Sequence, residues 1–162
     1  MQSAEIRPYD IAACEIEGWR GRCLNIFSRG EDAVAAALKT ARSHDSTVRI
    51  PHLAGQRLTE LERVTEKAAG TEKQKTGLAS ALADWKDCDE HRRYFSHGMT
   101  MVLLDRTGEW HVQFDMTVWR ANQPDPARLS WSKNEADAFE ARLADSFKFL
   151  SSQLGQFRKR LS

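Results

Sequence analysis

The sequence is poor in cysteine and has no long apolar run. Its three cysteines, Cys14, Cys23 and Cys88, are an odd number without close pairs, which argues against a disulfide framework and fits a reducing compartment. No stretch approaches the roughly 20 apolar residues that are needed to span a bilayer. The first ten residues are polar and charged and lack the apolar core of a signal peptide. We therefore expect a cytoplasmic protein with no membrane segment.

An excess of charge of one sign is also missing. The formal net charge is +1, so the chain lacks the global electrostatic signature of a protein that coats nucleic acid. There is no phosphate-binding glycine loop, no nucleophile elbow and no H-E-x-x-H motif. With 162 residues, no internal repeat and ordinary hydrophobic and charged fractions, residues 1–162 are expected to form a single globular domain.

The sequence does contain a series of helical patterns. Between Trp19 and Arg42, apolar residues recur at spacings of three and four, which predicts one face of a helix. Ser28-x-x-Glu31 is also a capping-box pattern, so a start at Ser28 is an alternative. Gly30 leaves both interpretations open, because glycine costs about 1 kcal/mol inside a helix. The residues before Trp19 are weakly patterned and receive no assignment.

Two more helices are expected before residue 98. Apolar residues at helical spacing predict a second helix that starts near Pro51 and is ended by Gly70. The capping-box pattern Thr71-x-x-Gln74 predicts the start of a third helix. We expect that helix to continue to Gly98, which is a good C-terminal signal.

The period of the pattern then changes from helical to two. An apolar run from Met99 to Asp105, a turn, and a segment in which apolar and polar residues alternate predict a β-hairpin over about residues 99–119. The segment from Asn122 to Arg128, which contains two prolines, is expected to be a loop that ends the hairpin.

Ser132-x-x-Glu135 predicts the cap of a last helix, whose apolar stripe runs from Ala136 to Leu161. The predicted fold class is therefore mainly α. It is a bundle of about four helices, with an inserted β-hairpin before a long C-terminal helix.

Arg92 and His97 are the pair that suggests chemistry. On a straight helix Arg92 lies about 40° from Leu78, inside an apolar arc, so its guanidinium needs an anion. Asp89 or Glu31 would make a structural ion pair, whereas a phosphate would make Arg92 a binding group. His97 is rotated from Arg92 by about 140°. The two side chains therefore share a site only in a groove completed by another element or subunit, and the alternative is a histidine that caps the last carbonyls.

The segment EHRRYFSHG, residues 90–98, resembles the R-x4-6-H signature of the HEPN superfamily, which is frequently followed by glycine. The order of expected elements from Trp19 to Gly98 is also similar to that family. The resemblance implies a HEPN-like helical bundle that acts as a metal-independent endoribonuclease and needs no cofactor. It also implies a homodimer that cleaves RNA through attack of the 2′-hydroxyl on the adjacent phosphate. The implied context is defence or a toxin–antitoxin system, with an antitoxin protein as a further partner.

The resemblance also assigns roles to residues. His97 would be the general acid/base, Arg92 would stabilise charge on the phosphorane, and Glu31 would orient Arg92. The sequence departs from the family at Arg93, where Asn, Asp or His is frequent, and Arg93 is an alternative arginine. The candidate catalytic residues are thus Arg92 and His97, and the supporting residues are Glu31, Asp89, Arg93 and Ser96.

Two other functions remain open. The first is a HEPN-fold module that binds RNA or a nucleotide without cleaving it, and the second is a helical interaction protein in which Arg92 and His97 are structural. No metal is expected, because Cys88, His91 and His97 lack the spacing of zinc ligands. Trp119 and Trp131, which flank the proline segment, would either stack on bases or cover the hairpin edge.

Overall fold

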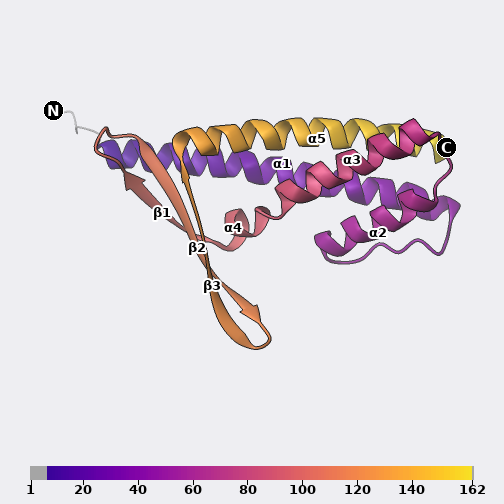
Figure 1. Ribbon diagram of the computed structural model, residues 1–162, viewed down its shortest axis with the longest axis horizontal. Coiled ribbons are helices and arrows are strands. Elements are labelled where there is room, and N and C mark those ends of the chain that lie inside the picture. Colours follow the sequence, from indigo (N-terminus) through magenta and orange to yellow (C-terminus); the bar gives the residue numbers. More distant parts are fainter. Residues whose placement is uncertain (1–6, 162) are drawn as a thin grey trace, which may run out of the picture. The chain divides into compact units, whose positions relative to one another are not determined.

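The computed structural model describes residues 7–161 and confirms the mainly α fold class (Figure 1). The helices and strands follow in the order α1 (Pro8–His44), α2 (Ala54–Lys67), α3 (Glu72–Asp89), α4 (Arg92–His97), β1 (Met99–Leu104), β2 (Trp110–Arg120), β3 (Gln123–Ser132) and α5 (Lys133–Leu161). A small sheet thus precedes a long C-terminal helix, as the sequence predicts. None of the helices in the described residues is both long and apolar enough to span a membrane.

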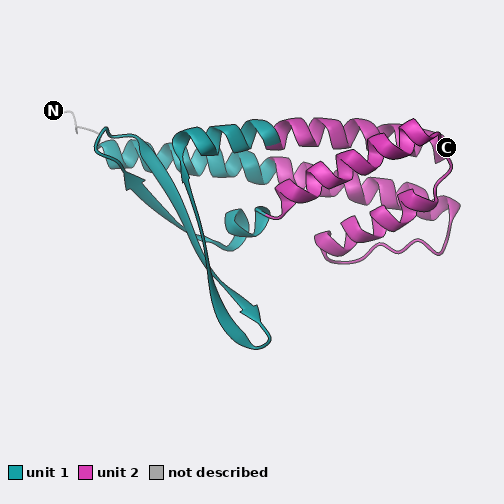
Figure 2. Ribbon diagram, viewed as in Figure 1, with its two compact units in different colours: residues 1–25, 91–142 teal, residues 26–90, 143–162 magenta. Residues whose placement is uncertain are grey.

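The chain forms two compact units, which Figure 2 shows in different colours. Unit 1 comprises residues up to Asn25 together with His91–Arg142, and unit 2 comprises Ile26–Glu90 together with residues from Leu143 onward. The sheet and α4 belong to unit 1, whereas α2 and α3 belong to unit 2.

Helix α1 is continuous from Pro8 to His44, so the first of the two interpretations of this region is confirmed and a start at Ser28 is wrong. Gly30 lies inside the helix for a packing reason. A Cβ atom at this position would overlap the six-membered ring of Trp85, whose Cε2 atom would be only 2.8 Å away. The glycine therefore marks a close approach of α1 to the Trp85 side chain and does not mark a helix end.

The boundaries of the next two helices differ from the expectation. Helix α2 begins at Ala54, because the chain is still extended at Leu53, and Pro51 lies in the preceding loop. The capping box of Thr71 and Gln74 is confirmed by both of its hydrogen bonds, at 3.3 and 3.0 Å.

Helix α3 ends at Asp89, so the expected continuous helix to Gly98 is wrong. Glu90 and His91 form a turn in which the Tyr94 N–H donates to the His91 carbonyl at 3.0 Å, a tighter i→i−3 pattern. No proline or glycine marks this interruption, which is why the sequence pattern does not reveal it. Gly98 ends the short helix α4 instead.

The sheet has three antiparallel strands in the order β1-β2-β3, one more than the predicted hairpin. The segment expected to be a loop forms β3, which pairs with β2 from Arg120↔Gln123 to His111↔Ser132. Pro124 and Pro126 are compatible with a strand because β3 is at the edge. Because they are two residues apart, their backbone nitrogens point in the same direction. That direction is away from β2, so neither proline removes a hydrogen bond from the sheet.

A tight turn joins β2 to β3. Its two residues, Ala121 and Asn122, have φ angles of 46° and 63°, as in a type I′ turn. Alanine is uncommon at such a position because its Cβ disfavours positive φ, so the sequence carries only a weak turn signal here.

The core of unit 1 is aromatic. The Trp19 ring lies 5.1 Å from Phe95 and 5.9 Å from Trp131, and Trp131 lies 4.7 Å from Phe139. The Trp19 indole N–H donates to the Ala136 carbonyl at 2.9 Å, which satisfies its polar atom in the core. Trp131 therefore packs against the other core rings, whereas Trp119 is 69% exposed.

The core of unit 2 is formed by α1, α2, α3 and α5. Trp85 lies between Phe27 and Phe147, with ring centroids 6.0 and 6.3 Å away.

The predicted cap of α5 is confirmed, because the Ser132 N–H and hydroxyl both donate to Glu135, each at 2.8 Å. The α5 stripe supplies buried side chains to both units, among them Phe139, Leu143, Leu150, Leu154 and Phe157.

Candidate functional site

The helix α4 carries four of the six candidate residues within six positions. Phe95 anchors the helix, since it is fully buried in the aromatic core of unit 1. At the other end, a Cβ at Gly98 would be 3.1 Å from the Phe114 Cβ and would press on the Tyr94 carbonyl. Glycine, which has no side chain, lets α4 end in close contact with β2, and the chain then continues as β1.

His97 is the last residue of α4 and its side chain is exposed. It lines an open groove of about 790 Å³ in unit 1, together with Met99, Asp115, Met116, Thr117, Pro126, Ala127 and Arg128. The groove thus lies between the end of α4 and the part of the β2–β3 hairpin that extends beyond β1. Of the two candidate catalytic residues, His97 is the one that lines this groove.

An ion pair fixes the opposite wall of this groove. Arg128 and Asp115 are cross-strand partners, and the Arg128 Nε donates to Asp115 Oδ1 at 2.6 Å. Gln113 donates to the other carboxylate oxygen at 2.9 Å. The hydrogen bond from Arg128 lowers the pKa of Asp115 and raises that of Arg128, so both groups are charged near neutral pH.

Arg128 is a site residue that the sequence reasoning missed, because it lies in the segment expected to be a loop. A signal was present. Ala127, Leu129 and Trp131 alternate with polar residues, which is the pattern of a half-buried strand. Recognition of this strand, together with its register on β2, would have placed Arg128 on the same face as Asp115.

Arg92 is half-buried at the start of α4 and is not among the groove residues. Arg93 is exposed, and its guanidinium lies over the Tyr94 ring at 5.1 Å from the centroid. Ser96 is exposed next to His97. The structure therefore brings Arg92 and His97 onto one short helix without placing both at the same groove.

The other two candidates belong to unit 2. Glu31 accepts a hydrogen bond from Arg57 at 3.3 Å, and Arg57 also donates to the His52 carbonyl at 2.7 Å. Arg57 was missed in the sequence because it lies 26 positions from Glu31 and belongs to a different helix. Asp89 is the last residue of α3. The expected support of Arg92 by Glu31 and Asp89 stays a prediction.

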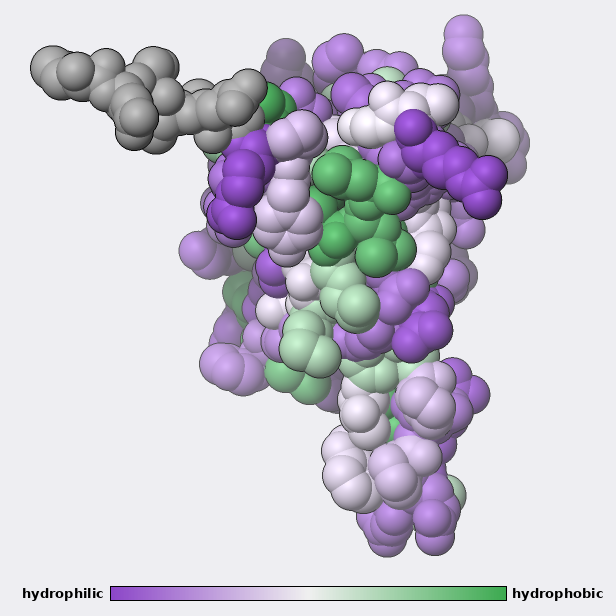
Figure 3. All heavy atoms as spheres, turned by 90° about the vertical axis from the view of Figure 1, so that its left-hand side faces the viewer, coloured by the Kyte–Doolittle hydropathy of each residue, from purple (hydrophilic) through white to green (hydrophobic). Residues whose placement is uncertain are grey.

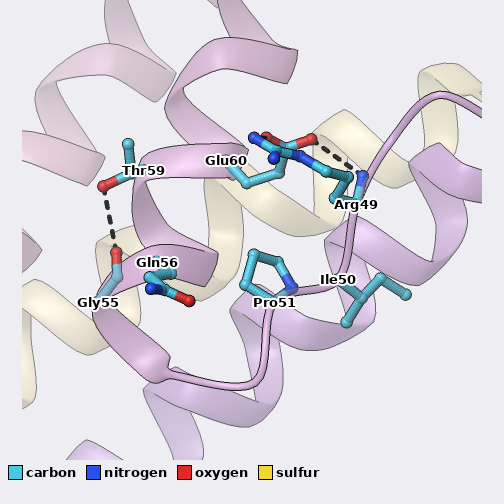
Figure 4. A pocket seen from close by; sticks show the side chains of 7 residues that line it. All are labelled: Arg49, Ile50, Pro51, Gly55, Gln56, Thr59 and Glu60. Atoms are coloured by element: carbon cyan, nitrogen blue, oxygen red, sulfur yellow. Dashed lines mark hydrogen bonds and ion pairs between the residues drawn. The ribbon is translucent and has the colours of Figure 1, made fainter.

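Unit 2 has a second hollow, of about 630 Å³, which Figure 4 shows from close by. Its polar centre is Glu60, whose side chain is only 3% exposed. Arg63 donates two hydrogen bonds to this carboxylate, and the Arg49 N–H donates a third, at 2.9 Å. These donors, Arg63 first, lower the pKa of Glu60 to about 2. The carboxylate thereby ties the loop around Arg49 to α2, which is a structural role.

Residues 7–161 contain no grouping of three or more His, Cys, Asp or Glu side chains that could hold a metal ion. Comparisons of the chain with protein-family models, with curated proteins and with solved structures find no match.

Proposed function

We propose that the protein is a HEPN-like, metal-independent endoribonuclease that uses His97 as its general acid/base. The observation that carries the proposal is the position of His97. The imidazole is exposed at the end of α4 and lines an open groove whose far wall holds the Arg128 guanidinium. An exposed histidine that shares a groove with a cation is a combination that general acid/base chemistry on a phosphodiester needs.

The reaction is an internal transfer at phosphorus. The ribose 2′-oxygen loses its proton and bonds to the adjacent phosphorus, while the bond from phosphorus to the 5′-oxygen of the next nucleotide breaks and that oxygen gains a proton. The products carry a 2′,3′-cyclic phosphate and a free 5′-hydroxyl. His97 would accept or donate one of the two protons, and an arginine would stabilise the negative charge on the phosphorane. Both Arg92, from the motif, and Arg128, from the groove, are candidates for that arginine.

A second function, RNA binding without cleavage, is favoured by a different observation. Arg128 is already paired with Asp115, and Arg92 lies outside the groove, so no arginine there is free of a carboxylate. A groove of this kind would bind a phosphodiester more readily than it would stabilise a phosphorane. The expected context of defence or toxin–antitoxin systems, with an antitoxin partner, belongs to the first proposal.

Incubation of the purified protein with single-stranded RNA in EDTA separates the two functions. For the ribonuclease, we expect a product with a cyclic phosphate end, lost in His97→Ala and retained in His52→Ala, which removes an exposed histidine of unit 2. Binding without any product, weakened by Arg128→Ala, would favour the second function. If the wild-type protein neither binds nor cleaves RNA, both proposals are wrong.

Comparison of two arginine variants then assigns the cation. Loss of cleavage in Arg92→Ala with recovery in Arg92→Lys would support the motif arginine, whereas the same behaviour at Arg128 would support the groove arginine. Circular dichroism and thermal unfolding control for folding, because Arg92 is half-buried and its removal also affects packing.

A further inference from the structure

The strand β1 leaves one edge of the sheet open. At its end, the Asp105 N–H donates to the Glu109 carbonyl at 3.0 Å, so the backbone groups of Asp105 point toward β2. In an antiparallel ladder these directions alternate. The N–H and C=O groups of Thr100, Val102 and Leu104 therefore point away from β2, toward the free edge.

The two edges of the sheet differ in their protection against pairing with another strand. On β3, Pro124 and Pro126 remove donors from the outer edge, which is a common protection against pairing with another strand. Strand β1, with the sequence MTMVLL, has neither a proline nor a charged side chain. By the same reasoning, β1 is an edge that can accept another strand.

Exposed apolar side chains accompany this edge. Met99, Met101 and Leu103 share the outer face of the sheet and are 69%, 42% and 43% exposed. Among the described residues, seven of the eight exposed large apolar side chains lie in unit 1, and four of these are on β1. Figure 3 shows apolar side chains gathered on the face of the molecule that carries this strand. Such a patch is typical of an interaction surface.

We propose that β1 pairs antiparallel with β1 of a second copy of this chain. A two-fold axis perpendicular to the sheet keeps the two outer faces on the same side. With the axis at Val102, that residue faces its own copy as a hydrogen-bonded pair, and Thr100 faces Leu104 of the second copy. On the outer face, Met101 then lies opposite Leu103 of the second copy, and the reverse.

Two features make β1 of a second copy a suitable partner for this strand. It carries no charge that would be brought against its own copy, and the exposed Met101 and Leu103 side chains of the two copies would form one apolar cluster of four across the axis. A six-residue strand alone buries less than the roughly 1,200 Å² of a standard interface, so we expect a dimer that dissociates on dilution.

This dimer would not bring the two proposed ribonuclease sites together. His97 is five residues from Val102, so at about 3.4 Å per residue the two His97 residues would be roughly 34 Å apart. Each chain would keep its own groove. RNA cleavage and dimerisation can therefore fail separately, and each is measured by its own assay.

Sedimentation velocity from micromolar to near-millimolar concentration tests the proposal, with two double variants of equal size. Met101→Glu/Leu103→Glu places like charges opposite each other and should weaken dimerisation by at least about tenfold. Met101→Lys/Leu103→Glu places opposite charges in register and should restore it. Thr117→Glu, which adds a charge to the same face on β2, should leave the dimer unchanged.

A wild-type protein that remains monomeric throughout would overturn the proposal. So would a dimer that Met101→Glu/Leu103→Glu leaves intact, because another surface would then form it. If both double variants are monomeric while circular dichroism shows the native fold, the register centred on Val102 is wrong.

Discussion

Replacement of Gly30 by alanine should destabilise the protein, although the same change stabilises an ordinary exposed helix. Alanine inside a helix is favoured over glycine by about 1 kcal/mol. At Gly30 the added Cβ would overlap the Trp85 ring, which is only 2% exposed and packs between Phe27 and Phe147. Overpacking of a core costs about 1–3 kcal/mol, and the overlap with a rigid ring favours the upper part of that range, about 2–3 kcal/mol. After the helix preference of about 1 kcal/mol is subtracted, we expect a net loss of about 1–2 kcal/mol.

The assay is urea unfolding of matched glycine variants. Nothing lies within 4 Å of a Cβ at Gly21 in α1 or at Gly155 in α5. Gly21→Ala and Gly155→Ala should therefore stabilise the protein by about 0.5–1 kcal/mol, the reverse of Gly30→Ala.

A double-mutant cycle then tests the cause. In a Trp85→Leu background the ring is gone, so Gly30→Ala should become neutral or stabilising. If Gly30→Ala stabilises the wild-type protein as much as the two control substitutions do, α1 does not approach Trp85 as described, and the account of Gly30 is wrong.

Three further predictions concern a carboxylate, the cysteines and a glycine. Because the folded-state pKa of Glu60 is lowered from 4.5 to about 2, its contribution to stability is present above pH 4.5 and is lost as the pH falls toward 2. Glu60→Gln should thus lower stability by about 2 kcal/mol at pH 7, and urea unfolding at a series of pH values should show the difference shrinking in acid. In the native protein a thiol reagent should label the exposed Cys14 quickly. Cys23 is buried, and burial raises the pKa of its thiol to about 12, so it should react only when the protein unfolds. Equal labelling rates for the two cysteines would contradict this prediction. Gly98→Ala should lower the melting temperature by several degrees, since its Cβ would press on the backbone, and an unchanged value would contradict the packing described for α4.

The parts of the fold that the sequence predicts are those with a repeated local signal. The stripes of α1 and α5 and the caps at Thr71 and Ser132 depend on spacings within a few residues, and the structure has all of them. The third strand was missed because proline usually argues against a strand. Its exception, an edge strand, becomes visible only when the partner strand is known.

The candidate site was less predictable, because its geometry depends on pairs far apart in the chain. The groove joins His97 to Arg128, 31 positions later, through the register of β2 with β3. Glu31 likewise meets Arg57 through the packing of α1 with α2. No local sequence pattern predicts either pairing. Spacing along the chain therefore pointed to residues close to His97 in the sequence, Arg92 and Asp89, as members of the site.

The break between α3 and α4 changes the directions in which Arg92 and His97 are expected to point. A straight helix would set the direction of Arg92 from Leu78, but the turn at residues 90–91 means that buried Phe95 sets it instead. At 100° per residue, Arg92 lies about 60° from Phe95 and His97 about 160° from it. One anchored side chain thus accounts for both the half-buried arginine and the exposed histidine. If His97 holds a phosphate on the groove side, that phosphate would lie closer in direction to Arg128 than to Arg92. If the protein cleaves RNA, Arg128→Ala should reduce cleavage more than Arg92→Ala does at equal folded fraction, and the reverse order would require α4 to rotate when RNA binds.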